Sequence, residues 1–468
     1  MKRAYKTELN PSKEQIIKIK KTLGTCRFIY NFYIAKNKEL FNYKKSLKKE
    51  LDKAKLNLFM SKLPLKDKTP TVHSDATPIV YSNAISKSTE LSTEVFNSTY
   101  ETHIKDLEEK YNNAPGFMNA NTFSKWLNNE FLPNNESYSW IKEVSSKAIK
   151  QSLRNGEKAY NNFFKGKNGF PKFKKKSQNE ASFYFVNQCN KAKLKSGIVN
   201  YNYTVEVERH RVKVPTLGFI KLKEKGYIPS GVDAISGTIT YKAGRYFISI
   251  LMDKDNENQV NLNPKSEGIG IDLGIKALAI LSNETIFKNI NKSSKIKKLE
   301  KKLKREQRSL SRMLENKKHR KGGSSKNIAK KILVIEKLHM RLFNIRTDYI
   351  NKVINEIIKL NPKFITIEDL NIKGLMKNHH LARHLANQKL GEFINKLTLK
   401  CNEFAIELRQ VSRWYPSSKT CSKCGSIKKD LKLSDRTYIC LNCGNIIDRD
   451  LNAALNLRDS TKYEVITT

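Results

Sequence analysis

The chain has 468 residues, with 89 Lys and Arg against 45 Asp and Glu, so its formal net charge is +44. Hydrophobic residues make up 38% of it, which at this length suffices for two to four packed domains and excludes disorder throughout. No stretch approaches the roughly 18 consecutive apolar residues of a membrane span, and the first residues lack the apolar core of a secretory signal. We therefore expect a soluble intracellular protein with no membrane partner.

The positive charge predicts a polyanionic partner, because so large a surplus would repel itself in isolation. The basic residues are spread along the chain and interleaved with 21 Phe and 19 Tyr, whereas a membrane-surface binder usually concentrates them in one amphipathic segment. Nucleic acid is thus the expected partner. A protein that only coats RNA would satisfy the charge, but it would not need the motifs described next.

The first 165 residues are predicted to form one short strand followed by helices. Ala4–Leu9 has the alternation of a strand, and Ser12 with Gln15 forms a capping box at the start of a helix. The helical pattern continues to about residue 165, interrupted by polar or Pro-containing loops near 62–82 and 112–121.

Residues 168–262 change to short runs rich in β-branched and aromatic residues, separated by turns. Examples are Ala181–Val186, Arg211–Pro215 and Tyr246–Leu251. Strands at this spacing predict an antiparallel barrel.

After a link at 263–267, the pattern becomes that of an α/β domain with a basic insert. The segment 268–274 is predicted to be a strand whose last residue is Asp272, followed by a tight turn at Gly274. Residues 292–321 then carry 14 Lys or Arg and three acids, with leucines at helical intervals, and helical periodicity resumes over 328–360. A basic helical hairpin is predicted, and its charge density favours phosphates nearby over a merely solvated face.

The α/β pattern then resumes with two more acids at the ends of elements. A strand at 363–370 contains Glu368, a helix is predicted at about 388–408 with a strand at 407–411, and a final helix starts from the acidic cap Asp448-Arg449-Asp450. Parallel strands present their carboxyl ends at one edge of a sheet, so these acids can converge there. Such a set suits two-metal phosphodiester hydrolysis with Mg²⁺, although each acid alone could be a helix cap or a surface turn.

Four of the seven cysteines have the spacing of a structural zinc site. Cys421, Cys424, Cys440 and Cys443 form a C-x2-C-x15-C-x2-C pattern, with a glycine after each pair. Four thiolates leave no open position for chemistry, and a redox pair is the alternative. The remaining cysteines are expected to be core thiols: Cys26, Cys189 and Cys401.

Several of these motifs together closely resemble the TnpB family of transposon-encoded, RNA-guided DNA endonucleases, which are similar to small type V CRISPR effectors. The motifs are Gly270–Gly274, Thr366–Leu370, Tyr415–Gly425 and Asp448–Ala454. Weaker matches lie at the Tyr5-Lys6 strand, Cys26–Asn31 and Gly169–Lys174. The long polar stretch from about 40 to 135 departs from the family pattern as an expansion.

The resemblance implies a multidomain α+β protein with an RNase H-like RuvC α/β nuclease domain, a zinc-ribbon insert, a β-barrel wedge domain and a helical recognition lobe. The implied parts are as follows: wedge-like barrel, 1–10 and 166–264; recognition lobe, 11–165; nuclease, 265–291, 347–416 and 446–458; basic helical insert, 292–346; zinc module, 417–445; tail, 459–468.

The resemblance also implies a site and its partners. The catalytic, Mg²⁺-binding acids would be Asp272, Glu368 and Asp450, with Asp448 as second choice for the third. A guide RNA from the transposon end would read double-stranded target DNA next to a short flanking motif. The protein would then act in the prokaryotic cytoplasm, associated with the nucleoid.

Nucleic-acid contacts are predicted at three places. Lys147, Gln151, Arg154 and Lys158 share one helical face suited to base edges, although an ordinary solvated face is equally compatible. Lys172 and Lys174 are expected to meet phosphates, as are Lys301 and Arg305 of the basic insert.

Two other functions remain open from sequence. A non-cleaving RNA-guided regulator should have lost one of the three acids, and none is missing. A DNA-strand-transfer transposase would need a domain that recognises the element's ends, and the sequence shows no clear helix-turn-helix for that role.

Overall fold

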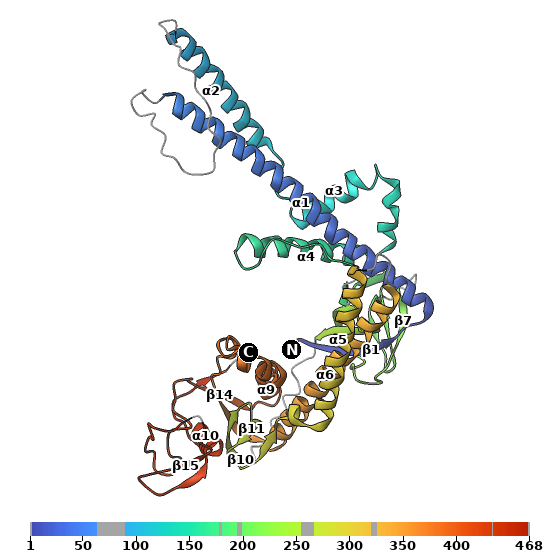
Figure 1. Cartoon of the computed structure of the whole chain (residues 1–468). Coiled ribbons are helices and arrows are strands. Elements are labelled where there is room, and N and C mark those ends of the chain that lie inside the picture. Colours follow the sequence, from blue (N-terminus) through green and yellow to red (C-terminus); the bar gives the residue numbers. More distant parts are fainter. Residues whose placement is uncertain are drawn as a thin grey trace. The chain divides into compact units, whose positions relative to one another are not determined.

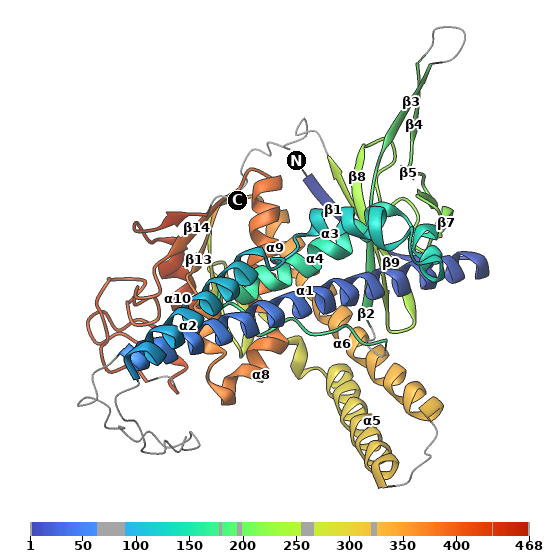
Figure 2. The ribbon, with the colours of Figure 1, turned by 90° about the horizontal axis from the view of Figure 1, so that it is seen from above.

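The computed structural model describes residues 2–62, 89–176, 180–193, 199–253, 266–319, 325–432 and 434–466 (Figures 1 and 2). The chain divides into two compact units, Lys2–Lys254 and Asp255–Thr468. The expected boundary after residue 264 falls within 254–265, outside the described residues. Among the described helices, none combines the length and apolar character needed to cross a membrane.

The first unit contains the predicted helical segment. It begins with the expected capping box, in which the Ser12 amide donates to Gln15 Oε1 at 3.0 Å and the Gln15 amide to Ser12 Oγ at 3.2 Å. The interruption predicted at 112–121 is present, whereas most of the one at 62–82 lies outside the described residues. Figures 1 and 2 both show the first two helices running side by side. The helices are α1 (Lys13–Lys62), α2 (Thr89–Asn113), α3 (Ala120–Trp126) and α4 (Ser146–Phe164), with a π-helical turn at Leu127–Phe131 and a 3-10 helix at Glu136–Glu143.

The helices pack on an aromatic cluster. Tyr33 and Phe123 have no exposed surface, and Tyr160 donates a hydrogen bond to the Ile34 carbonyl at 2.9 Å. Tyr33 likewise donates to the Met118 carbonyl at 2.7 Å. The buried hydroxyls are thus paired, as buried polar groups must be, and the cluster fixes α4 against α1.

The first unit also contains a seven-stranded antiparallel sheet in the order β2-β8-β9-β1-β7-β6-β5. Its edges approach each other after β2 and before β5, where the Gln188 amide donates to Thr204 Oγ1 at 2.8 Å and the Val205 amide to Asn187 Oδ1 at 2.9 Å. The sheet is therefore partly closed. Its strands are β1 (Lys2–Asn10), β2 (Glu180–Val186), β5 (Glu206–Val207), β6 (Arg211–Val214), β7 (Gly218–Leu222), β8 (Ala234–Lys242) and β9 (Arg245–Asp253), and a separate hairpin comprises β3 (Cys189–Lys193) and β4 (Val199–Tyr203).

The second unit is built on a mixed six-stranded sheet in the order β12-β11-β10-β13-β14-β17. Its three central strands β10, β13 and β14 are parallel, and the outer ones are antiparallel. The strands are β10 (Ser266–Leu273), β11 (Ala277–Leu281), β12 (Ile286–Lys288), β13 (Pro362–Glu368), β14 (Glu407–Val411) and β17 (Glu464–Val465).

Helices cover this sheet and extend from it. The helix predicted at 388–408 is wrong in extent: α9 ends at Glu403, and α7 and α8 precede it, where no helices were predicted. The predicted basic hairpin is present as α5 and α6, which lie side by side in Figure 1. The helices are α5 (Ser294–His319), α6 (Ser325–Lys359), α7 (Ile372–Leu375), α8 (His379–Gln388), α9 (Leu390–Glu403) and α10 (Arg449–Arg458), with a 3-10 turn at Ile290–Lys292.

Candidate active site and metal centre

Two of the three predicted acids lie at the carboxyl ends of adjacent parallel strands. Ile271 of β10 pairs with Ile367 of β13, so the next residues, Asp272 and Glu368, are neighbours across the two strands. Glu368 is the last residue of β13. Asp272 is the penultimate residue of β10, one position earlier than its expected place at the strand end.

The third acid comes to this edge on α10, whose backbone packs directly on β10. A Cβ atom added to Gly270 would lie 1.9 Å from the Ala454 carbonyl oxygen and 2.5 Å from the Arg458 nitrogen. Only glycine permits this approach of helix to strand. The Gly270 position therefore sets where α10 begins relative to Asp272.

Asp448 and Asp450 have different roles at the start of α10. Asp448 is the N-cap, and its Oδ1 accepts from the amides of Asp450 at 2.9 Å and Leu451 at 3.1 Å. The Asp450 carboxylate is not used as a cap. It pairs with Arg449 Nη2 at 3.1 Å, and Arg436 Nη1 lies 3.9 Å from it.

The electrostatics show that the three carboxyls form one group. The pKa of Asp272 is raised to about 7, mainly by burial and then by the charges of Asp450 and Glu368, against a smaller opposite effect of Arg449. Burial likewise raises the pKa of Glu368. Desolvated acids that repel one another favour a cation among them, because the cation stabilises all their ionised forms together.

The three acids supply the right type of ligand atom for a divalent cation, but they do not form a complete, closely spaced ligand set. Their oxygens are the ligand type that Mg²⁺ prefers. Among the residues that the structure describes, however, the only group of three or more possible metal ligands drawn closely together is the set of four cysteines. The three carboxyl groups are thus not drawn into one close ligand set.

The four predicted cysteines form a compact cluster that suits zinc. All four Sγ atoms lie within 4.8 Å of one another, with Cys421 3.7 Å from Cys443 and Cys424 3.6 Å from Cys440. A tetrahedral zinc with Zn–S bonds of about 2.3 Å requires Sγ separations of roughly 3.8 Å.

The other predicted core thiols have different surroundings. Cys26 and Cys401 are buried, as expected, and burial raises the pKa of both. The side chain of Cys189 lies outside the described residues.

Two buried asparagines of α10 join the cysteine cluster to the acid edge. Asn452 lies within the Asp448–Ala454 motif, but the sequence assigned it no role, and Asn456 lies outside the motif. Asn452 donates to the Thr420 carbonyl at 2.7 Å and accepts from the Ser422 amide at 2.9 Å. Asn456 donates to the carbonyls of Ser417 and Thr420, both at 2.7 Å. One helix therefore carries the third acid and fixes the start of the cysteine module.

Gly270→Ala should displace α10 and reduce stability, because the added methyl group meets helix backbone that cannot rotate away. We expect a loss of about 3 kcal/mol or more, typical of severe overpacking, measured by chemical denaturation. Gly169→Ala is a matched control, since nothing lies within 4 Å of its Cβ position. Equal stability of the two variants would contradict the close packing of α10 on β10.

The predicted base-reading face of α4 is accessible. Lys147, Arg154 and Lys158 are exposed and Gln151 is half-buried. Gln151 Nε2 donates to Asn155 Oδ1 at 3.1 Å, so the amide is oriented along the helix surface. This geometry is compatible with base contacts and equally with a solvated face.

The two predicted phosphate-binding lysines that follow α4 differ. Lys172 is exposed. Lys174 is also exposed, but its ammonium lies 4.3 Å from the centre of the Tyr30 ring, and partial burial of that group lowers its pKa. Asn31 holds the Lys174 backbone by two hydrogen bonds, of 2.8 and 3.0 Å. Lys174 therefore anchors its own segment to α1, and Lys172 is the better candidate for a phosphate.

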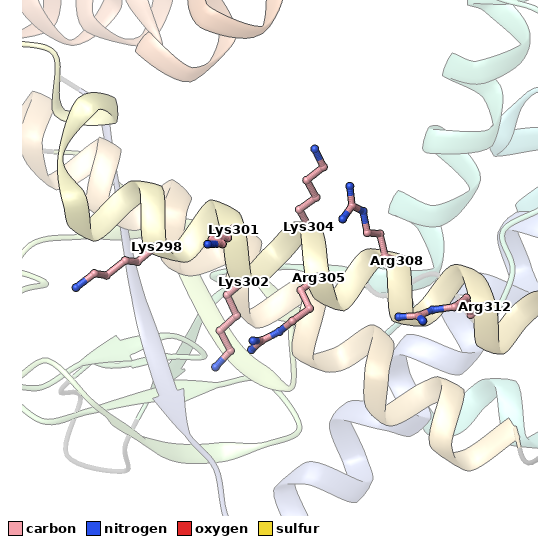
Figure 3. Close-up of a pocket in the computed structure, with 7 residues that line it drawn as sticks. All are labelled: Lys298, Lys301, Lys302, Lys304, Arg305, Arg308 and Arg312. Carbon is pink, nitrogen blue, oxygen red and sulfur yellow. The ribbon is translucent and has the colours of Figure 1, made fainter.

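Helix α5 presents a face of cations, of which Arg305 lies 3.9 Å from Glu306. Its apolar residues pack against α6 through Leu303 and Leu338, and two of its acids pair with α6: Glu306 with Lys331 and Glu300 with Arg346, both at 2.8 Å. Seven basic side chains line open space of about 670 Å³, and Figure 3 shows them pointing away from the helix in several directions. All of the residues that line this space come from this one helix, so it is a charged surface and not an enclosed cavity. They are Lys298, Lys301, Lys302, Lys304, Arg305, Arg308 and Arg312.

Three family models match the chain. The model described as "Cas12f1-like, TNB domain" matches residues 391–457, and the OrfB_IS605 model, described as "Probable transposase", matches residues 249–379. The model described as "Helix-turn-helix domain" matches residues 1–46. In the structure these residues are strand β1 and part of α1, which runs as one helix from Lys13 to Lys62, so the segment does not have the fold in that description.

Curated relatives agree with these models. A protein of Streptomyces pristinaespiralis named "Putative RNA-guided DNA endonuclease" is 29% identical over 69% of this chain and 73% of its own length. InsQ of Escherichia coli K12, with the same descriptive name, is also 29% identical, over 68% of this chain and 75% of its own. The TnpB-like protein L79 of Acanthamoeba polyphaga mimivirus is 36% identical over 26% of this chain and 24% of its own.

Solved structures of Cas12f complexes align along nearly the whole chain but superpose loosely. A CRISPR-Cas12f ternary complex aligns over 99% of this chain and 100% of the other at 15% identity, with a TM-score of 0.34. A Cas12f1–sgRNA–target DNA complex aligns over 98% and 99% at 17% identity, with a TM-score of 0.30. By the family models and the curated relatives, the chain resembles the TnpB family.

Proposed function

We propose that this protein is an RNA-guided, Mg²⁺-dependent DNA endonuclease of a transposable element. The observation that carries the proposal is the meeting of Asp272, Glu368 and Asp450 at one sheet edge, where their carboxyls share one electrostatic environment. The names of the curated relatives support the same activity. The net charge of +44 supports partners that are nucleic acids.

The acids share one role in the proposed hydrolysis. Asp272, Glu368 and Asp450 would together hold the Mg²⁺ ions. When bound, the ions supply an activated water and stabilise the leaving 3′ oxygen. Arg449 and Arg436 hold the Asp450 carboxylate at the helix start, so this side chain is oriented before a metal binds.

The cysteine cluster would hold a structural zinc. Four thiolates close a tetrahedral shell and leave no position for substrate. Because Asn452 and Asn456 tie this module to α10, the zinc would stabilise the helix that carries the third acid.

The cationic face of α5 would bind nucleic-acid phosphates. Replacing both Lys301 and Arg305 by Ala should weaken guide-RNA binding whatever the RNA sequence. The slope of the logarithm of the RNA association constant against the logarithm of salt concentration should become shallower by about one for each lost phosphate contact. Filter binding across a salt series measures this. Lys352→Ala is the control, because that lysine of α6 already pairs with Asp348 at 2.9 Å. An unchanged slope in the double variant would exclude α5 from the interface.

The function is tested by copurification followed by cleavage. The protein is expressed with its native flanking DNA, and the bound RNA is sequenced. That complex is added, with Mg²⁺, to plasmids that carry the guide-matched target beside randomised bases. Guided cleavage next to one enriched motif, lost in Asp272→Ala, is the expected result.

Two other outcomes would replace the proposal. RNA-dependent binding without cleavage would identify a non-cleaving regulator. Strand transfer without selective RNA would identify a transposase, the activity in the description of the model that matches residues 249–379.

A further inference from the structure

One large aromatic side chain near the acid edge is almost fully exposed. Trp414 has 86% of its surface accessible, whereas Trp126 and Trp140 pack against the aromatic cluster of the first unit. Leaving an indole in water forgoes the stabilisation that burial would provide. A single exposed apolar residue is common on protein surfaces, so position and surroundings have to decide whether Trp414 has a role.

The turn that carries Trp414 is fastened beside Glu368. Val411 at the end of β14 pairs with Glu368 at the end of β13, and Trp414 follows three residues later. Asp369, the residue after Glu368, donates its amide to the Val411 carbonyl at 2.9 Å and accepts from Arg413 Nε at 2.9 Å. The residue next to Trp414 is therefore tied to the residue next to a predicted metal ligand.

The other side of the same turn is fastened to α10. The Tyr415 amide donates to the Ser412 carbonyl at 2.9 Å, which closes the turn, and Tyr415 Oη donates to the Asn456 carbonyl at 3.3 Å. Asn456 lies on the helix that carries Asp450. Trp414 is thus presented by a turn attached on both sides to elements that carry the acids.

The segment that carries Trp414 is rich in basic residues. Residues 412–436 contain seven Lys or Arg and two Asp. A polyanion is favoured beside this surface over an apolar protein segment, and an exposed indole offers a face on which any nucleobase can stack. Duplex bases stack on one another and present no free face, so the arrangement selects an unpaired strand.

We propose that Trp414 is a stacking platform for a base of single-stranded DNA at the acid edge. This inference rests on the proposed nuclease function and extends it. The side chain acts by positioning: a base stacked on Trp414 fixes the strand beside Glu368, which favours entry of the adjoining phosphate among the three acids. Unpaired DNA would be the form in which the strand is cut.

The test must report on Trp414 itself, because a chain with a net charge of +44 will bind an oligonucleotide at several places. The full-length Asp272→Asn protein is titrated with an oligothymidylate in buffer without added Mg²⁺, and tryptophan emission is followed. The oligonucleotide should quench the emission, and a blunt duplex of equal length should quench it far less. Trp414→Phe should abolish the quenching, whereas Trp140→Phe should retain it.

Measurements of oligonucleotide affinity and of cleavage kinetics then distinguish base stacking on Trp414 from a structural role of this residue. Trp414→Ala should bind the oligonucleotide about tenfold more weakly, while Trp414→Phe, which keeps an aromatic face, should bind nearly as well as the parent. Both should melt like the parent, since the side chain contributes little buried surface. In the active background, Trp414→Ala should raise KM for the cut strand more than it lowers kcat.

Three outcomes would each overturn the inference. The quenching could persist in Trp414→Phe, or Trp414→Ala could bind the oligonucleotide as tightly as the parent. An RNA oligonucleotide could also quench the emission more strongly than the DNA oligonucleotide does. The tryptophan-emission titration does not require cleavage, so it still tests base stacking on Trp414 if the nuclease proposal fails. Cleavage lost in Asp272→Ala but unaffected in Trp414→Ala would leave the nuclease intact and reject the platform.

Discussion

Asp272→Asn should abolish DNA cleavage, with a loss of about 10³-fold or more, equivalent to several kcal/mol of transition-state stabilisation. The reason is that an amide cannot supply the negative charge with which a carboxylate would help to hold Mg²⁺. Cleavage of the guide-matched plasmid under single-turnover conditions measures this effect. Asp450→Asn should behave in the same way.

Asp448→Asn is the matched control for both variants. Asparagine caps a helix as well as aspartate does, so the hydrogen bonds to the amides of Asp450 and Leu451 are retained. We expect this variant to keep most of its cleavage activity. The reverse pattern, in which Asp448→Asn is inactive and Asp450→Asn active, would make Asp448 the third acid.

The same Asp272→Asn variant should be more stable than the parent in buffer without added Mg²⁺. The pKa of Asp272 is raised to about 7 in the folded chain, from an ordinary value of 3.8. Between these values the folded state holds a proton that the unfolded state has lost, so stability falls as pH rises through this range. The gain in the variant should be on the order of 2–4 kcal/mol at pH 8 and should vanish near pH 4. Denaturation at several pH values measures it, and a gain independent of pH would show that ionisation of Asp272 is not its cause.

Removal of one cluster cysteine should have the largest effect on folding. Cys424→Ser should remove a large part of the roughly 10–16 kcal/mol that structural zinc contributes to folding of its module. We expect loss of bound zinc, measured by elemental analysis, and a lower melting temperature of the second unit. Through Asn452 and Asn456, cleavage should fall as well.

The control for this variant is a cysteine away from the cluster. Cys401 is fully buried and isolated from the other thiols, so Cys401→Ala should lose only the 1–2 kcal/mol or so of a small core cavity and keep its zinc. Cys424→Ser with full zinc and an unchanged melt would show that the cluster does not hold a metal.

The placement of the acids at the ends of elements and the grouping of the four cysteines could be predicted from sequence, because each depends on residues that are close together in the chain. A strand that ends in an acid, a capping aspartate and two C-x2-C pairs are local features. Even there, prediction was imperfect: β10 runs to Leu273, one residue beyond Asp272, and the helix predicted at 388–408 stops at Glu403.

What the sequence did not predict depends on contacts between distant segments. Gly270 fits a strand, and only the structure shows that the Ala454 carbonyl occupies the space of its missing side chain. Lys174 fits a basic run, but Tyr30 and Asn31 hold it against α1. The exposure of Trp414 likewise cannot be read from its neighbours in the chain, because burial is decided by what packs over a residue.

The direct packing of α10 on Gly270 also determines which segments of the chain can vary in length. The three acids are fixed by pairing of β10 with β13 and by contact of α10 with β10, and neither depends on the length of the chain between these elements. The basic hairpin and the cysteine module are inserted in those intervals. Evolution or engineering can therefore enlarge or shorten the basic hairpin while the geometry of the acids is preserved, provided that residue 270 stays glycine. A changed cysteine module must also keep the carbonyl groups that Asn452 and Asn456 of α10 contact.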